Sequence, residues 1–144
     1  MTDFEIYKST VYQVIGAAMR VHTVLKKGLL EQIYQEALSL ELKELGIDNE
    51  REKEIHCYYK HYLLEKTYKA DLVIDNIIVE LKSVKTLLPE HRAQLFNYMR
   101  LTKSHIGLLI NFGNDSLQGE RYGLIEEDNE CVFLDKNMRI ISYE

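Results

Sequence analysis

The sequence predicts an α/β fold in which helices pack against a β-sheet. Three observations lead to this prediction. Up to residue 45 the apolar side chains recur at helical spacing, residues 47–82 alternate with a period near two, and a later helical segment precedes the apolar stretch HIGLLINFG at 105–113. Because there is one proline and neither an internal repeat nor a low-complexity tract, we expect a single domain over residues 1–144.

The first predicted helix spans residue 3 to about residue 26. Thr2 and Glu5 have the spacing of a capping box, and Gly28 interrupts the helical pattern after the last turn. The apolar residues at helical spacing are Val11, Val14, Ile15, Ala18, Val21 or His22, and Leu25. We therefore expect these residues to form the buried face of the helix.

A second helix is predicted from about residue 29 to 45, with Gly46 as its C-terminal stop. Its apolar stripe consists of Tyr34, Leu38, Leu42 and Leu45. On the same helical wheel Glu31 falls at the edge of this stripe or within it. A lone acidic residue in that position is unusual and makes Glu31 a candidate functional residue.

Strands are predicted for residues 47–82, with turns at Lys60-His61 and Asp75-Asn76. Pro89 suits the first turn of a third helix that ends near Thr102. Residues 105–113 predict an interior strand because they are apolar on both faces. For the remainder, 114–144, we expect a polar loop followed by a hairpin of the strands ECVFLD and MRIISY.

Composition limits the functional classes. No stretch approaches the ~20 apolar residues that span a bilayer, and the N-terminal MTDFEIYKST does not have the pattern of a secretory signal. We therefore expect a cytoplasmic protein without a membrane partner. Cys57 and Cys131 lack the spacing of a zinc site or a disulfide scaffold, so both are interpreted as packing residues.

The net charge of −5 gives the chain no overall attraction for nucleic acid. Lysine and arginine contacts to phosphate supply most non-specific affinity for DNA, so a protein that simply coats DNA is disfavoured. An enzyme that binds metal ions through acidic residues is not excluded, because the bound cations reverse the local field.

The segment YKADLVIDNIIVELKS, residues 68–83, places two carboxylates among apolar residues. If Asp75 and Asn76 form the turn, Asp71 faces Glu80 across the hairpin. One face then carries Ala70, Leu72, Ile74, Ile77, Val79 and Leu81, and the other carries Lys69, Asp71, Val73, Ile78, Glu80 and Lys82.

Two facing carboxylates at roughly 5 Å repel by about 3 kcal/mol at an effective dielectric constant of about 20. A lysine, a shared proton or a divalent cation can cancel this repulsion, and oxygen ligands at this spacing suit Mg²⁺ or Mn²⁺. The alternative is an ordinary salt-bridged surface formed by Lys69, Asp71, Glu80 and Lys82. The strongly apolar strands and the helix that follows favour the metal site.

The helix PEHRAQLFNYMRLT places His91, Gln94 and Tyr98 on one stripe. Gln94 and Tyr98 can hydrogen-bond a phosphate or a metal-bound water without adding charge. The alternative is an exposed Gln94 and a Tyr98 that only packs in the core. The other histidines lack ligand spacing and are interpreted as structural.

Four separated motifs resemble the GxxExxY family: GLLEQIY at 28–34, YKADLVIDNIIVELKS, HRAQLFNY and GLLINFG. Together they cover roughly residues 5 to 113. That family is similar to the PD-(D/E)XK nuclease superfamily, so the resemblance implies a restriction-endonuclease-like core with helices packed on a mixed central sheet. Ala70 replaces the superfamily's proline, and the acidic segment after residue 113 is not the expected surface for gripping DNA.

The resemblance also implies a site. Asp71 and Glu80, with Glu31 and the carbonyl of Leu81, would bind one or two Mg²⁺ or Mn²⁺ ions. Lys82 would position the attacking water or screen negative charge, and Gln94 and Tyr98 would hold the substrate or the nucleophile.

The expected function is therefore metal-dependent hydrolysis of a phosphodiester in nucleic acid, with DNA favoured over RNA. One alternative is a nuclease-like fold that has lost catalysis and acts as a binding module for protein or nucleic acid. Another is action on a small phosphorylated molecule. A homodimer would enlarge the contact surface, but nothing in the sequence shows the oligomeric state.

Overall fold

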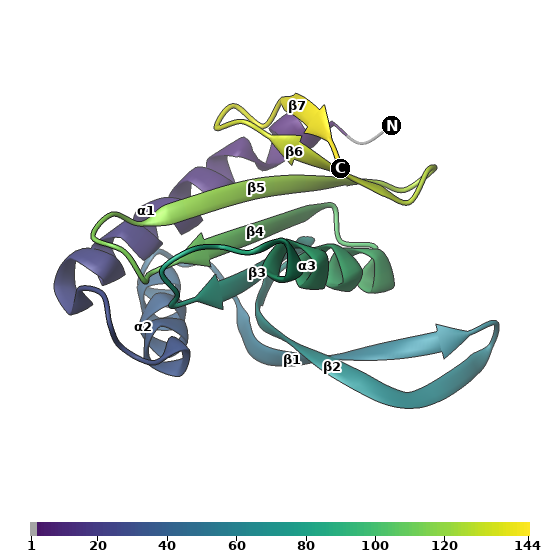
Figure 1. Cartoon of the computed structure of the whole chain (residues 1–144), viewed down its shortest axis with the longest axis horizontal. Helices are drawn as coiled ribbons and strands as arrows, with labels where there is room; N and C mark the ends of the chain where they lie inside the picture. Colours follow the sequence, from purple (N-terminus) through teal and green to yellow (C-terminus); the bar gives the residue numbers. More distant parts are fainter. Residues whose placement is uncertain (1–2) are drawn as a thin grey trace.

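A computed structural model describes residues 3–144 of the chain. Its elements are the 3₁₀-helix η1 (Phe4–Tyr7), α1 (Lys8–Leu25), α2 (Glu31–Glu44), β1 (Glu50–Tyr59), β2 (Tyr62–Ile74), β3 (Ile77–Lys82), α3 (Pro89–Thr102), β4 (Ile106–Asn111), β5 (Gln118–Ile125), β6 (Glu130–Leu134) and β7 (Ile140–Tyr143). The described strands form one seven-stranded sheet in sequence order (Figure 1). β3 and β4 pair in parallel and the other neighbours pair antiparallel, so the sheet is mixed.

The helices lie on both faces of this sheet. One hydrophobic cluster joins α1 and α2 to side chains such as Leu72, Val79 and Leu108. A second cluster joins α3 to side chains such as Ile78, Leu109 and Tyr122 on the opposite face. β3 and β4 lie between the two clusters, which explains why their sequences are apolar on both faces.

The parallel pairing of β3 and β4 determines where α3 lies. Parallel neighbours require a crossover connection. α3, which lies between β3 and β4 in the sequence, forms this connection on one face of the sheet (Figure 1). Pro89 begins the helix and Thr102 ends it, as the sequence predicts. The side chains of α3 therefore pack over β3 and β4, and Gln94 of α3 reaches Lys82 at the end of β3.

The N-terminal helices differ in detail from the prediction. The segment 3–26 is divided into η1 and α1, and Asp3 caps its start by accepting the N–H of Glu5 at 3.0 Å. The predicted cap residue Thr2 lies outside the described residues. α2 ends at Glu44, so the prediction that Leu45 belongs to the buried stripe is wrong: Leu45 follows the helix and is 43% exposed.

The predicted turns of the antiparallel strands are confirmed. Lys60 and His61 connect β1 to β2, and Asp75 and Asn76 connect β2 to β3, with Asp75 in the left-handed region at φ 51°. The predicted register of β2 and β3 is also confirmed, with pairs Leu72–Val79, Val73–Ile78 and Ile74–Ile77.

The prediction for Ala70 is wrong. Ala70 packs in the α3 cluster, whereas Leu72 and Ile74 pack in the α1 and α2 cluster. The alternation of faces therefore shifts by one residue at Asp71. At this point β2 leaves β3, and Glu52 of the neighbouring strand β1 adopts a positive φ of 49°.

The largest correction concerns residues 118–125, which were expected to lie in a polar loop but form β5. This strand contains two glycines and the charged pair Glu120 and Arg121, which obscure its strand character. Arg92 of α3 neutralises Glu120 through two hydrogen bonds of 2.8 Å. The terminal hairpin is confirmed as β6 and β7.

Cys57 and Cys131 are both buried and unpaired, as expected for packing residues. Within residues 3–144, none of the helices has the length and apolar character needed to cross a membrane.

Candidate functional site

The candidate site lies where β2 separates from β3. The regular pairing of β2 and β3 ends at Leu72 and Val79. At the next residues, Asp71 and Glu80, side-chain carboxylates accept the hydrogen bonds of backbone N–H groups. The N–H of Asp71 donates to Oε1 of Glu80 at 3.1 Å, and the N–H of Leu81 donates to Oδ2 of Asp71 at 2.8 Å. The predicted proximity of the two acids is thus confirmed, and backbone donors determine their orientation.

Glu80 is a buried acid with a strongly perturbed ionisation. Only 3% of the residue is exposed. Burial raises the pKa of Glu80 to about 9, the charge of Asp71 contributes next, and Lys82 opposes the shift. At neutral pH, therefore, Glu80 retains a proton in the absence of a cation. Of the three ways to cancel carboxylate repulsion, the raised pKa favours the proton when no cation is bound.

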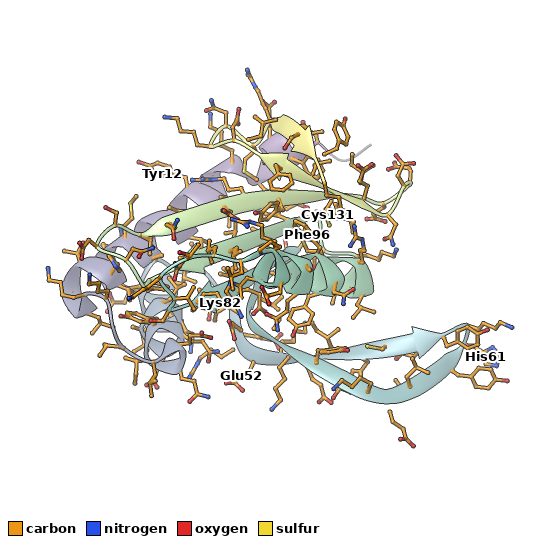
Figure 2. The ribbon with its side chains drawn as sticks, in the orientation of Figure 1. Tyr12, Glu52, His61, Lys82, Phe96 and Cys131 are labelled. Atoms are coloured by element: carbon orange, nitrogen blue, oxygen red, sulfur yellow. The ribbon has the colours of Figure 1, made fainter. Side chains whose placement is uncertain are left out.

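Lys82 begins a chain of polar contacts toward α3. Its Nζ donates to Oε1 of Gln94 at 3.0 Å, and Nε2 of Gln94 donates to the hydroxyl of Tyr98 at 3.1 Å. Gln94 is exposed and Tyr98 is 5% exposed, so these two hydrogen bonds lead from the solvent-exposed surface to the core. Burial, followed by the charge of Glu80, raises the pKa of Tyr98. The predicted stripe thus faces the two acids, and Figure 2 shows Lys82 beside α3.

His91 begins the same predicted stripe but has a structural contact. Its Nδ1 accepts the N–H of Leu88 at 2.9 Å, which satisfies a backbone donor at the start of α3. The stripe therefore contributes Gln94 and Tyr98 to the candidate site, while His91 orders the helix that carries them.

Gln35 is a site residue that was not predicted from the sequence. This α2 residue is 3% exposed, and its Nε2 donates to Oδ1 of Asp71 at 3.4 Å. Its Oε1 accepts from Nε of Arg51 at 3.1 Å, so Gln35 connects the site to β1. The signal in the sequence was a glutamine next to Tyr34 and one helical turn after Glu31, on the side of α2 that faces the sheet.

Glu31 lies at the exposed N-terminus of α2, so of its two predicted positions, at the edge of the apolar stripe or within it, the position within the stripe is excluded. It lines a shallow hollow together with Ser83, the residue after Lys82. The hydroxyl of Ser83 donates to the carbonyl of Leu29 at 2.8 Å and ties the loop before α2 to the end of β3. The start of α2, which carries Glu31, is thereby tied to the residue that follows Lys82.

Tyr34 fixes the loop that precedes α2. Its hydroxyl donates to the carbonyl of Lys26 at 2.5 Å and accepts the N–H of Leu29 at 3.1 Å. Its ring stacks on Phe112, with centroids 4.4 Å apart. Gly28, in the same loop, has a φ of 100°, which disfavours other residues. The glycine and the tyrosine of the GLLEQIY segment therefore shape the entry to the helix that carries Glu31.

Asn111, which was also not predicted from the sequence, binds the backbone of the segment that follows Lys82. It is fully buried, and its Oδ1 accepts the N–H groups of Val84 and Gly113, each at 3.0 Å. Its Nδ2 donates to the carbonyl of Val84 at 2.9 Å and to Oε1 of Gln118 at 2.8 Å. This amide therefore determines the path of the chain directly after Lys82.

The donor set fits a hard divalent cation. Within residues 3–144, no three His, Cys, Asp or Glu residues converge as a ready-made metal cluster. Mg²⁺ does not require such a cluster, because it binds through one or two carboxylates and retains several waters. Asp71 and Glu80 supply two carboxylates, and a cation between them would replace the proton that their proximity now requires.

Comparisons with known proteins bear on the fold and the family of this chain. No curated protein matches the chain. Among solved structures, the crystal structure of SSO0001 is similar, with 20% sequence identity and a TM-score of 0.55, and the alignment covers 85% of this chain and 64% of that protein. At this identity the similarity shows the fold alone. The model of the PD-(D/E)XK nuclease superfamily matches residues 8–122.

The predicted fold is thereby confirmed as restriction-endonuclease-like, with helices packed on a mixed sheet. The matched segment contains Asp71, the Glu80-Leu81-Lys82 sequence, Gln94 and Tyr98. Because the match extends over most of its length, the chain belongs to the PD-(D/E)XK nuclease superfamily.

Proposed function

We propose that the chain is a metal-dependent phosphodiesterase that acts on nucleic acid, with DNA as the favoured substrate. Membership of the superfamily supports nuclease activity in general. The observation that carries the proposal is the Asp71–Glu80 pair, oriented by backbone N–H groups and flanked by Lys82. A purely structural role does not require two carboxylates at a point where one of them must remain protonated.

Asp71 and Glu80 would hold Mg²⁺ or Mn²⁺, with the carbonyl of Leu81 and with Glu31 from the rim as further oxygen donors. When bound, the metal would lower the pKa of a coordinated water and stabilise the charge that develops on the phosphate. The backbone N–H groups of Asp71 and Leu81 orient the two carboxylates, and each carboxylate oxygen that accepts one hydrogen bond, including Oδ1 of Asp71 with Gln35, retains a further lone pair for a metal.

Lys82 would screen the additional negative charge on the phosphate during attack by water. Its contact with Gln94 leaves two of the three ammonium hydrogens free for substrate. Gln94 and the hydroxyl of Tyr98 would position the substrate or the attacking water from the α3 side. Water would lose a proton to solvent and form the new P–O bond, the bridging P–O bond would break, and the leaving oxygen would take up a proton from solvent.

The four sequence motifs also support assignment to the GxxExxY family. In this assignment the glycine and tyrosine of GLLEQIY are loop residues: Gly28 supplies the positive φ, and Tyr34 binds the loop backbone. Glu31 is then the residue of that motif whose carboxylate is free to serve the site.

The test is a cleavage assay with end-labelled single-stranded DNA, duplex DNA and RNA, each with Mg²⁺, Mn²⁺ or EDTA. We expect metal-dependent cleavage by the parent and a loss of at least about 100-fold in Asp71→Asn, Glu80→Gln and Lys82→Met. Glu54→Gln, an exposed change of the same type on β1, is the matched control and should retain activity.

A second candidate is a nuclease-like fold that serves as a binding module. One observation favours it: the β1–β2 hairpin extends away from the helices (Figure 1) and carries large exposed side chains near its end. These are Tyr58, Tyr59, Tyr62 and Leu63, each at least 59% exposed. If the parent binds the labelled strands but cleaves none of them with either metal, the binding module replaces the nuclease.

A further inference from the structure

A second hollow lies on the α1 side of the sheet, away from the two carboxylates. It has a volume of about 470 Å³ and is bounded by α1, β5 and the turn between β6 and β7. Its wall includes four cationic side chains: Lys8 and Arg20 from α1, Arg121 from β5, and Lys136 from the turn. Glu80 and Tyr98 belong to the α3 side, and Figure 2 shows Tyr12 of this hollow well apart from Lys82.

The charge of this hollow is opposite to that of the whole protein. None of the described residues that line it is acidic, although the chain has a net charge of −5. Two acids lie nearby. Glu41 accepts from Nε of Arg20 at 3.2 Å, and Asp135 interacts with Arg121 electrostatically but uses Oδ1 for the backbone N–H groups of its own turn. Arg20 is therefore paired with Glu41, whereas Lys8, Arg121 and Lys136 have no salt bridge within residues 3–144.

Arg121 is the most informative of the four. Its Nε is the one inaccessible side-chain nitrogen or oxygen without a hydrogen-bond partner among residues 3–144. Burial lowers the pKa of Arg121, whereas its neighbour Glu120 on the other face is paired with Arg92. Buried polar groups are almost always hydrogen-bonded in native proteins. The Nε of Arg121 is itself inaccessible, but the side chain is only half-buried and lines the hollow beside Lys8 and Lys136, where it can pair with an anion.

The wall also offers an apolar surface. Ile15 is buried at its base, while Tyr12 and Met19 are 79% and 55% exposed at its edge. An exposed tyrosine ring beside a cationic hollow can stack against a planar ring of a ligand. The volume lies within the range of pockets that enclose small molecules.

We propose that this hollow binds a nucleoside di- or triphosphate. Arg121, Lys8 and Lys136 contact the phosphates, and Tyr12 stacks on the base. A small polyanion needs only the hollow. A longer nucleic-acid strand would extend beyond the hollow over a protein whose net charge is −5, which opposes its binding. The proposal goes beyond nuclease activity and does not depend on it.

The test is calorimetric titration of the full chain in EDTA, which removes any contribution from a metal at Asp71 and Glu80. The probes are pyrophosphate, adenosine and the diphosphates of adenosine, guanosine, cytidine and uridine. We expect saturable binding of at least one nucleoside diphosphate, at least about fivefold tighter than pyrophosphate because of stacking on Tyr12. Tyr12→Ala should abolish that difference.

Lys136→Ala and Lys8→Ala remove exposed cations and should not impair folding. Each should weaken nucleotide binding by about tenfold, the size expected for loss of a charge-assisted hydrogen bond. Lys43→Ala removes the same charge from α2, and Glu80→Gln alters the other site; neither should change the affinity.

Three results would each overturn the proposal. One is the absence of saturable binding for all four diphosphates. Another is pyrophosphate binding as tightly as the nucleotides. The third is equal weakening in Lys136→Ala and Lys43→Ala, which would indicate a diffuse charge effect. Loss of nuclease activity in any variant is irrelevant to these outcomes, since binding is measured without metal.

Discussion

Replacement of Glu80 by glutamine should stabilise the protein in the absence of metal. The folded state holds the Glu80 proton up to a pKa of about 9, whereas the ordinary value is 4.5. Between these two values the unfolded state is ionised and the folded state is not, so the free energy of unfolding falls as pH rises. Glutamine does not ionise and can replace both contacts of the protonated acid, because its amide donates to Asp71 and its oxygen accepts the Asp71 N–H.

The magnitude follows from the pKa shift. A pH of 7.5 is about 3 units above the ordinary pKa that Glu80 has in the unfolded state. Keeping this carboxyl protonated in the folded state therefore costs about 4 kcal/mol, at 1.36 kcal/mol per unit. The gain should vanish near pH 4.5 and grow with pH up to about 9. Because small domains have total stabilities of about 5–15 kcal/mol, such a gain is readily measured.

The assay is urea unfolding followed by circular dichroism at pH 5, 6.5 and 8 in EDTA, for the parent, Glu80→Gln and Glu54→Gln. Glu54 is exposed on β1, and its substitution should change stability by less than about 0.5 kcal/mol at every pH. A Glu80→Gln variant that is no more stable than the parent at pH 8, or whose difference does not change with pH, would refute the reasoning about the buried proton.

Three further predictions concern metal binding and packing. Binding of Mg²⁺ at pH 7.5 should release about one proton from Glu80, which calorimetry in two buffers of different ionisation enthalpy detects; a heat independent of buffer contradicts this. Asn111→Ala should lower the free energy of unfolding by about 3 kcal/mol in urea titrations, because the buried N–H groups of Val84 and Gly113 lose their acceptor. The control is Asn97→Ala, which changes an exposed asparagine on α3; an equal effect there would contradict this explanation. Gly113→Ala should cost about 2 kcal/mol or more, since the new Cβ would lie 2.1 Å from the carbonyl oxygen of Val84; an unchanged unfolding midpoint would exclude that clash.

Several features of the fold could be predicted because they depend on neighbours along the chain. The helical spacing and Pro89 predicted α3 with its observed bounds, and the period of two predicted β1 to β3. The two-residue turn at Asp75-Asn76 determines the register by counting, and the register brings Asp71 next to Glu80. The core of the candidate site was therefore accessible from the sequence.

Other features depended on partners distant in sequence. β5 was missed because its Glu120 is neutralised by Arg92, 28 residues away in the chain. Ala70 was assigned to the wrong face because alternation shifts where β2 leaves β3, which local periodicity does not show. Leu45 was assigned to the core because helical spacing does not reveal the residue at which α2 ends.

The sequence by itself determined the bounds of α3, the turn between β2 and β3, and that two carboxylates and a lysine share one hairpin. Only the tertiary structure decided that Gln35 reaches Asp71, that Lys82 connects to Tyr98 through Gln94, and that Glu80 is buried deeply enough to keep its proton. The physical reason is that hydrogen bonds and turns between chain neighbours follow from residue type and spacing. Solvation, in contrast, depends on every segment that packs around a group, and α2 and α3 reach Asp71 and Glu80 only when the chain has folded.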